Sequence, residues 1–362
     1  MRLVFIHLGR KFPKHLELNI KRHLEVFPNI PISIVYNLSE KKEKLNLNPF
    51  NSLDYYKYTK DEKTLQIFNK LNHDSGFRNN FWNITLERFY ALEKFHNERP
   101  NEKILHIESD VLLLPNFPWE KFNSLDKVWY TRYNSEKDVA SLLFSPNSKK
   151  TNQMVELISI ALENNPNLTD MTALSILSHN FDQQFKILPS SPKLKNSLLN
   201  NYNTCVNEKS SIYENFNLFG GIFDPAPFGM WITGQDPRNH FGFTQVKSRN
   251  IIESGDSYVD PSKFRYKLNN LGELSVSING TITYLWSLHV HSKNKKLFNK
   301  NWILELRKFV DRSQSDKQFS LFSINVLVDL LNANIKQKTL IRFLLNMPYL
   351  RKLKVFLKRF IN

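Results

Sequence analysis

The chain has little cysteine and no long apolar segment. It contains a single cysteine, Cys205, among 362 residues. One cysteine excludes an intramolecular disulfide and a multi-cysteine zinc site. Nowhere do about 18 apolar residues follow one another, so no transmembrane helix is predicted, and the first residues lack the h-region and cleavage site of a signal peptide. We therefore expect a cytoplasmic protein.

Acidic residues are fewer than basic ones. Thirty-four Asp and Glu stand against 50 Lys and Arg, which gives a formal net charge of +16. This surplus favours anionic partners such as nucleic acid, anionic lipid or phosphorylated substrates. No zinc-finger spacing or RNA-recognition signature is evident, so nucleic acid is not expected. The hydrophobic fraction of 41% is enough for one large α/β domain with an appendage.

The opening of the chain has a β-α-β pattern. Residues 2–8 and 31–36 form short apolar runs, and residues 16–27 between them have helical spacing, which predicts a parallel sheet flanked by helices. Polar residues 37–63 indicate a loop or a short helix. Further helices are predicted at residues 81–96, 150–164 and 170–177, and further strands at 127–131 and 140–144.

A candidate metal motif follows the apolar run at residues 104–107. Glu108-Ser109-Asp110 comes where this buried strand stops, and ligands of α/β sheets bind beyond the carboxyl ends of such strands. In an extended chain Glu108 and Asp110 point to one side while Ser109 faces away. Oxygen ligands in a partly open site suit Mg²⁺ or Mn²⁺. The alternative is an ordinary strand-to-turn junction with solvated acids.

Glycine is scarce, and four of the ten glycines lie between residues 220 and 234. The same segment carries two Asp-Pro pairs, Asp224-Pro225 and Asp236-Pro237, together with Trp231 and Arg238. Packing alone does not explain this composition, which is typical of a functional loop. Asp-Pro pairs are also common turn formers, so a turn role for Asp224 and Asp236 stays open.

Taken in order, these segments resemble the GT-A fold glycosyltransferases of bacterial polysaccharide synthesis. Their metal motif is D-x-D or E-x-D at the end of a central strand, as in Glu108-Ser109-Asp110. The other matching segments are Asp170-Met171-Thr172-Ala173-Leu174, the loop from Phe223 to Asn239, and Leu288-His289-Val290-His291-Ser292-Lys293. One departure is the missing glycine-rich segment soon after the metal motif, where residues 139–144 are apolar instead.

The resemblance implies a Rossmann-like, mixed and mainly parallel sheet, and it implies roles for particular residues. The metal, Mn²⁺ or Mg²⁺, would be held by Glu108, Asp110 and a histidine. We expect His289 and His291 on one face of a strand and prefer His291 as the ligand, because it lies closer to the strand end; two core histidines are the alternative. The donor would be bound by His7, Gly9, Arg78, Ser109 and Lys293, and the acceptor by Trp231, Arg238 and Asn239.

The expected activity is metal-dependent transfer of a sugar from a nucleotide-diphosphate sugar, such as a UDP-sugar. The acceptor would be a hydroxyl of a growing or lipid-linked bacterial surface glycan: capsule, lipopolysaccharide or lipooligosaccharide. An inverting reaction needs a base, for which Asp236, Asp224 and Asp170 are the candidates. The alternatives are a metal-dependent nucleotidyl- or phosphotransferase and a noncatalytic basic membrane- or nucleic-acid-binding protein.

The end of the chain differs in composition from the rest. Residues 340–361 mix large apolar side chains with clustered Lys and Arg, a pattern typical of an interfacial helix attracted to anionic lipid. A terminal helix docked on the protein is the alternative. We expect a catalytic domain at residues 1–300, with its donor half at about 1–150 and its acceptor half at about 151–300, and a basic helical region at 301–362 that attaches peripherally to the inner face of the cytoplasmic membrane.

Overall fold

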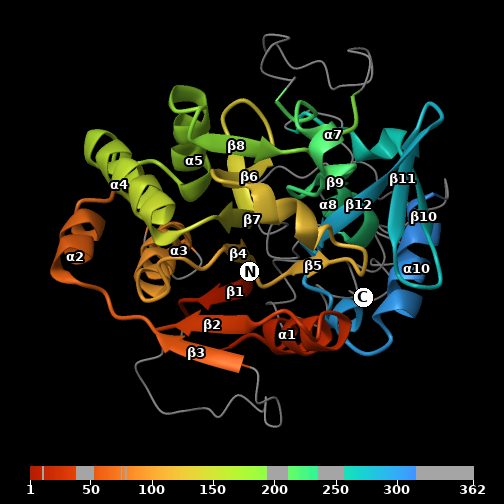
Figure 1. Ribbon diagram of the computed structural model, residues 1–362, viewed down its shortest axis with the longest axis horizontal. Helices are drawn as coiled ribbons and strands as arrows, with labels where there is room; N and C mark the ends of the chain where they lie inside the picture. The colour runs from red at the N-terminus through yellow and green to blue at the C-terminus, as the bar shows by residue number, and fades with distance from the viewer. Residues whose placement is uncertain are drawn as a thin grey trace, which may run out of the picture.

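The computed structural model describes two β-sheets joined side by side (Figure 1). It covers residues 1–9, 12–37, 53–74, 76–77, 80–193, 211–234 and 257–314. Within these residues the first sheet has seven strands in the order β3-β2-β1-β4-β7-β6-β8. The second has the order β10-β11-β12-β5, with β9 beside β12.

The predicted β-α-β opening is confirmed. β1 (Arg2–His7), α1 (Lys14–Val26) and β2 (Ile32–Tyr36) follow one another, and β1 pairs in parallel with β2 and with β4 (Ile104–Ile107). The interpretation of residues 37–63 as a loop or helix is wrong for β3 (Leu53–Lys57), which extends the sheet beside β2. β3 is a polar, half-exposed edge strand, so it carries no apolar run that would reveal it.

The strands predicted at residues 127–131 and 140–144 and the helices predicted at 81–96, 150–164 and 170–177 are confirmed, whereas β8 (Phe185–Leu188) was not predicted. Strand pairing turns antiparallel only around β7 and is parallel again between β6 and β8. The mixed, mainly parallel α/β fold flanked by helices is therefore confirmed. The elements are α2 (Glu62–Asn69), α3 (Phe81–Asn97), β6 (Val128–Arg132), β7 (Asp138–Ser145), α4 (Ser148–Asn164), α5 (Asp170–Asn180) and β8 (Phe185–Leu188).

Two apolar cores cover the two faces of this sheet. Successive side chains of a strand point to opposite faces, and in β1 Val4 joins a core with α3, α4 and α5, while Leu3 and Phe5 join a core with α1. Leu16 and Ile20 of α1 are buried there at helical spacing. Helices on both faces bury β4 and the middle of β1, as expected for strands inside a mainly parallel sheet.

The second sheet has its own core. It comprises β5 (Val111–Leu113), β9 (Gly221–Phe223), β10 (Arg265–Leu268), β11 (Leu274–Ile278) and β12 (Thr281–His289). The helices α7 (Phe216–Phe219), α8 (Pro227–Thr233) and α10 (Trp302–Ser313) lie nearby. Trp302 and Leu306 of α10 are buried in this core, so residues beyond 300 still pack against the second sheet. The predicted domain boundaries stay predictions.

The predicted membrane-associated tail lies almost wholly outside the described residues, which end at residue 314. Within the part of the chain that the structure describes, no helix combines the length and apolarity needed to cross a bilayer.

Candidate metal centre and surrounding site

The candidate metal motif is the turn by which the chain passes from one sheet to the other. β4 ends at Ile107 in the first sheet, and β5 begins at Val111 in the second. The Val111 N–H donates to the Glu108 carbonyl at 3.1 Å and closes a tight turn. The expectation of an extended chain through Glu108 and Asp110 is therefore wrong. Ser109 nevertheless faces away from both acids, toward α1, where its hydroxyl lies 3.1 Å from His15 Nε2.

Glu108, Asp110 and His289 converge at this turn. Ligand atoms of the three side chains all lie within 4.8 Å of one another. His289 Nε2 is 3.5 Å from a carboxylate oxygen of each acid. The pairing of β12 with β5 sets this arrangement, because it places His289 opposite Val111, the residue after Asp110. Two carboxylates and one imidazole form a donor set that suits Mn²⁺ and is compatible with Mg²⁺.

The charges in this cluster are strongly coupled. Burial disfavours a protonated His289, but the carboxylates of Asp110 and Glu108 outweigh burial and raise the pKa of His289 to about 9. Burial likewise opposes ionisation of Asp110, yet Lys293 and His289 hold the pKa of Asp110 well below its usual range. A divalent cation at these carboxylates would supply the positive charge that the protonated His289 supplies here, and it would bind the neutral imidazole.

His289, rather than the preferred His291, lies with the two carboxylates. β12 ends at His289, so His291 is not on the same strand face; it follows in a turn, with its ring centroid 5.7 Å from that of His289. Lys293 reaches the cluster from this turn, and its Nζ lies 2.9 Å from Asp110. The left-handed backbone at Lys293, with φ of 52°, folds the chain back toward the acids.

Arg88 is a site residue that the sequence interpretation missed. Its buried guanidinium, on α3, donates to Glu108 and also to Asp170 at 2.5 Å. Burial raises the pKa of both acids, but Arg88 reverses the shift only at Glu108, whose pKa is lowered, while the pKa of Asp170 stays raised. A basic residue four positions after Ile84 and seven before Phe95 lies on the apolar face of its helix. A charged residue on the apolar face of a helix was therefore the sequence feature that could have identified Arg88 as a site residue.

Asp224 joins the start of α8 to the end of β12. It is fully buried and accepts backbone N–H groups from Phe228 at 3.1 Å, Gly229 at 2.7 Å and His289 at 3.0 Å. Burial outweighs these hydrogen bonds and raises the pKa of Asp224 to about 6. Both carboxylate oxygens are thus engaged with the backbone that positions His289.

Three of the other predicted binding residues, His7, Gly9 and Trp231, lie in the described part of the chain. His7 ends β1 and Gly9 follows closely, so that a β-carbon on Gly9 would lie 3.0 Å from the His7 ring. Trp231 lies on α8 and packs partly buried against the core of the second sheet. Four predicted residues lie outside the described residues: Arg78, Asp236, Arg238 and Asn239.

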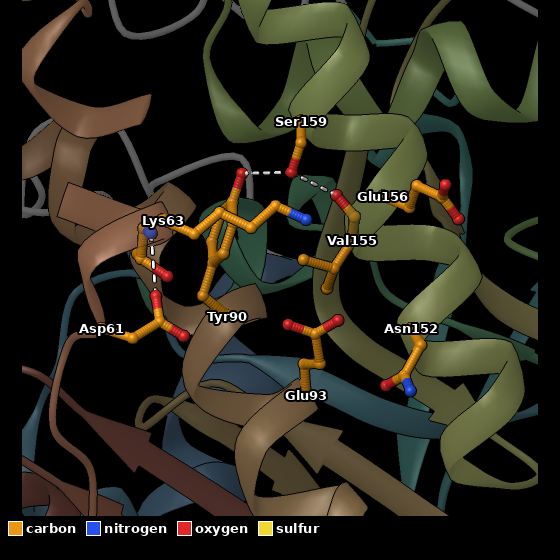
Figure 2. Close-up of a pocket in the computed structure, with 9 residues that line it drawn as sticks. Asp61, Lys63, Tyr90, Glu93, Asn152, Val155, Glu156 and Ser159 are labelled. Atoms are coloured by element: carbon orange, nitrogen blue, oxygen red, sulfur yellow. Dashed lines mark hydrogen bonds between the residues drawn. The ribbon is translucent and has the colours of Figure 1, made fainter. Parts of the chain in front are cut away.

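A separate cavity lies between α2, α3 and α4 (Figure 2). Its volume is about 180 Å³, and Asp61, Glu93 and Glu156 line it together with Lys63. None of the predicted site residues borders it. Its chemistry is therefore independent of the Glu108-Asp110-His289 cluster.

No protein-family model and no curated protein matches the sequence. Among solved structures, the chain is similar to galactosyltransferase LgtC in complex with donor and acceptor sugar analogs, with a TM-score of 0.38 and 14% identity over 52% of this chain and 73% of that one. It is also similar to the glycosyltransferase GlyE of Streptococcus pneumoniae TIGR4, with a TM-score of 0.35 and 16% identity over 52% of this chain and 44% of that one. These likenesses concern about half of the chain and carry no argument about its activity.

Proposed function

We propose that the protein is a metal-dependent glycosyltransferase that uses a nucleotide-diphosphate sugar as donor. The observation that carries the proposal is the convergence of Glu108, Asp110 and His289 where β4 ends, with the Lys293 ammonium beside them. Ligands of α/β sheets bind at such strand ends. A hard cation and a lysine side chain together suit a diphosphate.

The residues of the cluster have distinct tasks in this proposal. Glu108, Asp110 and His289 would hold Mn²⁺ or Mg²⁺. When bound, the ion supplies Lewis-acid neutralisation of the departing nucleotide diphosphate. Arg88 fixes the Glu108 carboxylate through its guanidinium. Lys293 offers a second positive charge to the donor phosphates, because its flexible stem lets it move between Asp110 and a phosphate.

The acceptor hydroxyl must lose a proton if the reaction inverts configuration. We propose that neither Asp170 nor Asp224 is the base. Asp170 is paired with Arg88, and both oxygens of Asp224 accept backbone N–H groups. Asp236 stays the predicted base for an inverting reaction; with retention its carboxylate would serve another role.

The proposed substrates are a UDP-sugar and a hydroxyl of a growing bacterial surface glycan, such as capsule, lipopolysaccharide or lipooligosaccharide. The support is the ordered series of sequence motifs and the net charge of +16, which favours anionic partners. The basic segment at residues 340–361 would hold the enzyme at an anionic membrane. Removal of the residues after 335 should abolish sedimentation with anionic liposomes; undiminished sedimentation would contradict the attachment.

The proposed activity is tested by incubating a panel of nucleotide sugars with the protein, with and without Mn²⁺. We expect Mn²⁺-dependent release of a nucleoside diphosphate from one donor. Asp110→Asn should lower the rate by more than about 100-fold. Asp126→Asn, at an exposed acid, is the matched control and should not change it. Release of pyrophosphate would support a nucleotidyltransferase instead, and activity unchanged in Asp110→Asn would refute the metal-dependent mechanism.

A further inference from the structure

One face of the second sheet exposes large apolar side chains to solvent. On β12, Ile282 is 74% exposed and Tyr284 is 44% exposed, whereas Thr283, between them, and Leu285, after Tyr284, are buried. Because side chains alternate along a strand, the inner face packs on the core and the outer face carries Ile282 and Tyr284. Two large exposed apolar side chains next to each other on one strand face call for an explanation other than packing.

The exposed ring of Tyr284 packs against Trp286, which is itself only 7% exposed and belongs to the core that includes α1. The ring of Tyr284 stacks on that of Trp286, with centroids 5.1 Å apart and planes 22° apart. The indole of Trp286 lies across Gly221 of the neighbouring strand β9, where a β-carbon would come within 2.3 Å of the ring. Gly221 is also the register partner of Tyr284. The missing side chain at Gly221 is what lets the two rings lie side by side.

Polar and basic side chains continue this surface across the sheet. Residues directly opposite one another in an antiparallel pair share a face, and strands lie about 4.8 Å apart. Two rows therefore run from β10 over β11 to β12, each about 10 Å long between its ends. The rows are Lys267–Ser275–Tyr284 and Arg265–Ser277–Ile282.

The charge of this face is positive. Arg265 and Lys267 are exposed, and within the described part of the chain neither makes an ion pair. The neighbouring acid, Glu273, accepts a hydrogen bond from Asn269 at 2.7 Å. The surface thus combines the exposed ring of Tyr284, serine hydroxyls and two cations that have no carboxylate partner among the described residues.

We propose that this face, the Tyr284–Lys267 surface, is an accessory binding site for an acidic oligosaccharide. The C–H face of a sugar ring packs on an aromatic face, its hydroxyls pair with serines, and its carboxylate or phosphate groups pair with Arg265 and Lys267. Tyr284 precedes His289 by five residues of β12, about 17 Å, so a glycan held here would lie near the metal cluster without entering it. The identification of the occupant as a glycan rests on the proposed transferase function.

The test is direct binding of the full chain to an array of acidic and neutral oligosaccharides, without donor or metal. We expect retention of acidic oligosaccharides and at least a fivefold loss of affinity in Tyr284→Ala and in the double variant Arg265→Ser/Lys267→Ser. Tyr55→Ala is the matched control, because Tyr55 is 43% exposed on the other sheet, and it should bind like the wild type. Thermal unfolding of each variant verifies that it is folded.

Two results would overturn the proposal: no acidic oligosaccharide is retained, or retention is the same in all variants. Donor hydrolysis in Tyr284→Ala should match the wild type, because Tyr284 is not part of the metal cluster. The two proposals fail separately. If the wild type binds acidic oligosaccharides on the array but hydrolyses no donor, the transferase function is refuted and the proposed binding surface is not. If it hydrolyses a donor but binds no oligosaccharide, the binding surface is refuted and the transferase function is not.

Discussion

Gly229 of α8 lies directly against the backbone of His289. A β-carbon at Gly229 would be 1.7 Å from the His289 carbonyl oxygen and 2.9 Å from a carboxylate oxygen of Asp224. Asp224 in turn accepts the His289 N–H. The position of the candidate metal-binding imidazole therefore depends on a glycine in a helix that is distant in sequence.

The substitution Gly229→Ala tests this dependence. The added methyl group must displace the His289 backbone, so we expect a loss of about 1–3 kcal/mol in the free energy of unfolding and a weaker affinity for Mn²⁺. Chemical denaturation and a Mn²⁺ titration measure the two effects. Gly280→Ala is the control, because Gly280 has open space around it but a φ of +80°. It should lose about 1 kcal/mol and keep its Mn²⁺ affinity; an equal loss of affinity in both variants would contradict the role of Gly229.

Arg88 is expected to support both stability and the metal centre. Arg88→Met leaves Glu108 and Asp170 buried without their shared counter-charge, so we predict a loss of about 3–5 kcal/mol in the free energy of unfolding. Mn²⁺ affinity should also fall, because Glu108 loses its hydrogen-bond donor. Urea unfolding and a Mn²⁺ titration check the prediction.

Arg132 offers a matched control for Arg88. It forms another buried ion pair, with Asp138 at 2.8 Å, away from the Glu108-Asp110-His289 cluster. Arg132→Met should destabilise the fold by a similar amount and leave Mn²⁺ affinity unchanged in the folded protein. If the two variants have the same Mn²⁺ affinity, Arg88 acts on stability alone.

The cavity of Figure 2 predicts a pH dependence of stability. Burial raises the pKa of Glu93 to about 7, with Asp61 and Glu156 adding to the shift and Lys63 and Lys94 opposing it. The ordinary value, 4.5, applies to the unfolded chain. Between these two pKa values the folded state binds more protons than the unfolded chain. The contribution of Glu93 to the free energy of unfolding is therefore fully present below pH 4.5 and is lost as the pH rises through about 7.

The substitution Glu93→Gln isolates this contribution. At pH 8 we expect the variant to be more stable than the wild type by about 1–2 kcal/mol, since solvent screening of the half-buried group reduces the full effect. At pH 4 the two proteins should be equally stable. Glu120→Gln, at an exposed glutamate, should show no such difference. Denaturation curves at both pH values measure this difference in stability. A gain in the stability of Glu93→Gln that is the same at both pH values would contradict titration of Glu93 as the cause.

The apolar patterns in the sequence were enough to predict most of the first sheet and its helices. β4 and α3 were found because their buried residues have strand and helix spacing. β3 was missed because an edge strand needs no apolar run, as the half-exposed Tyr55 and Tyr56 illustrate. The order of motifs along the chain was likewise enough to predict that Glu108, Asp110 and a histidine lie at one site.

The parts of the site that sequence could not predict depend on tertiary contacts. The choice between His289 and His291 depends on where β12 ends, which is fixed by its pairing with β5 and by Asp224. Arg88 reaches Glu108 only because α3 packs near the end of β4. Neither relationship is encoded in local spacing.

The proposed metal centre requires His289, and not His291, as its histidine ligand. The decisive measurement compares the Mn²⁺ affinities of the wild type, His289→Ala and His291→Ala by electron paramagnetic resonance. Free Mn²⁺ gives a strong signal, and this signal is lost when the ion binds to the protein. We predict that His289→Ala weakens Mn²⁺ binding by at least about tenfold and that His291→Ala binds like the wild type. Wild-type affinity in His289→Ala would contradict a metal centre formed by Glu108, Asp110 and His289.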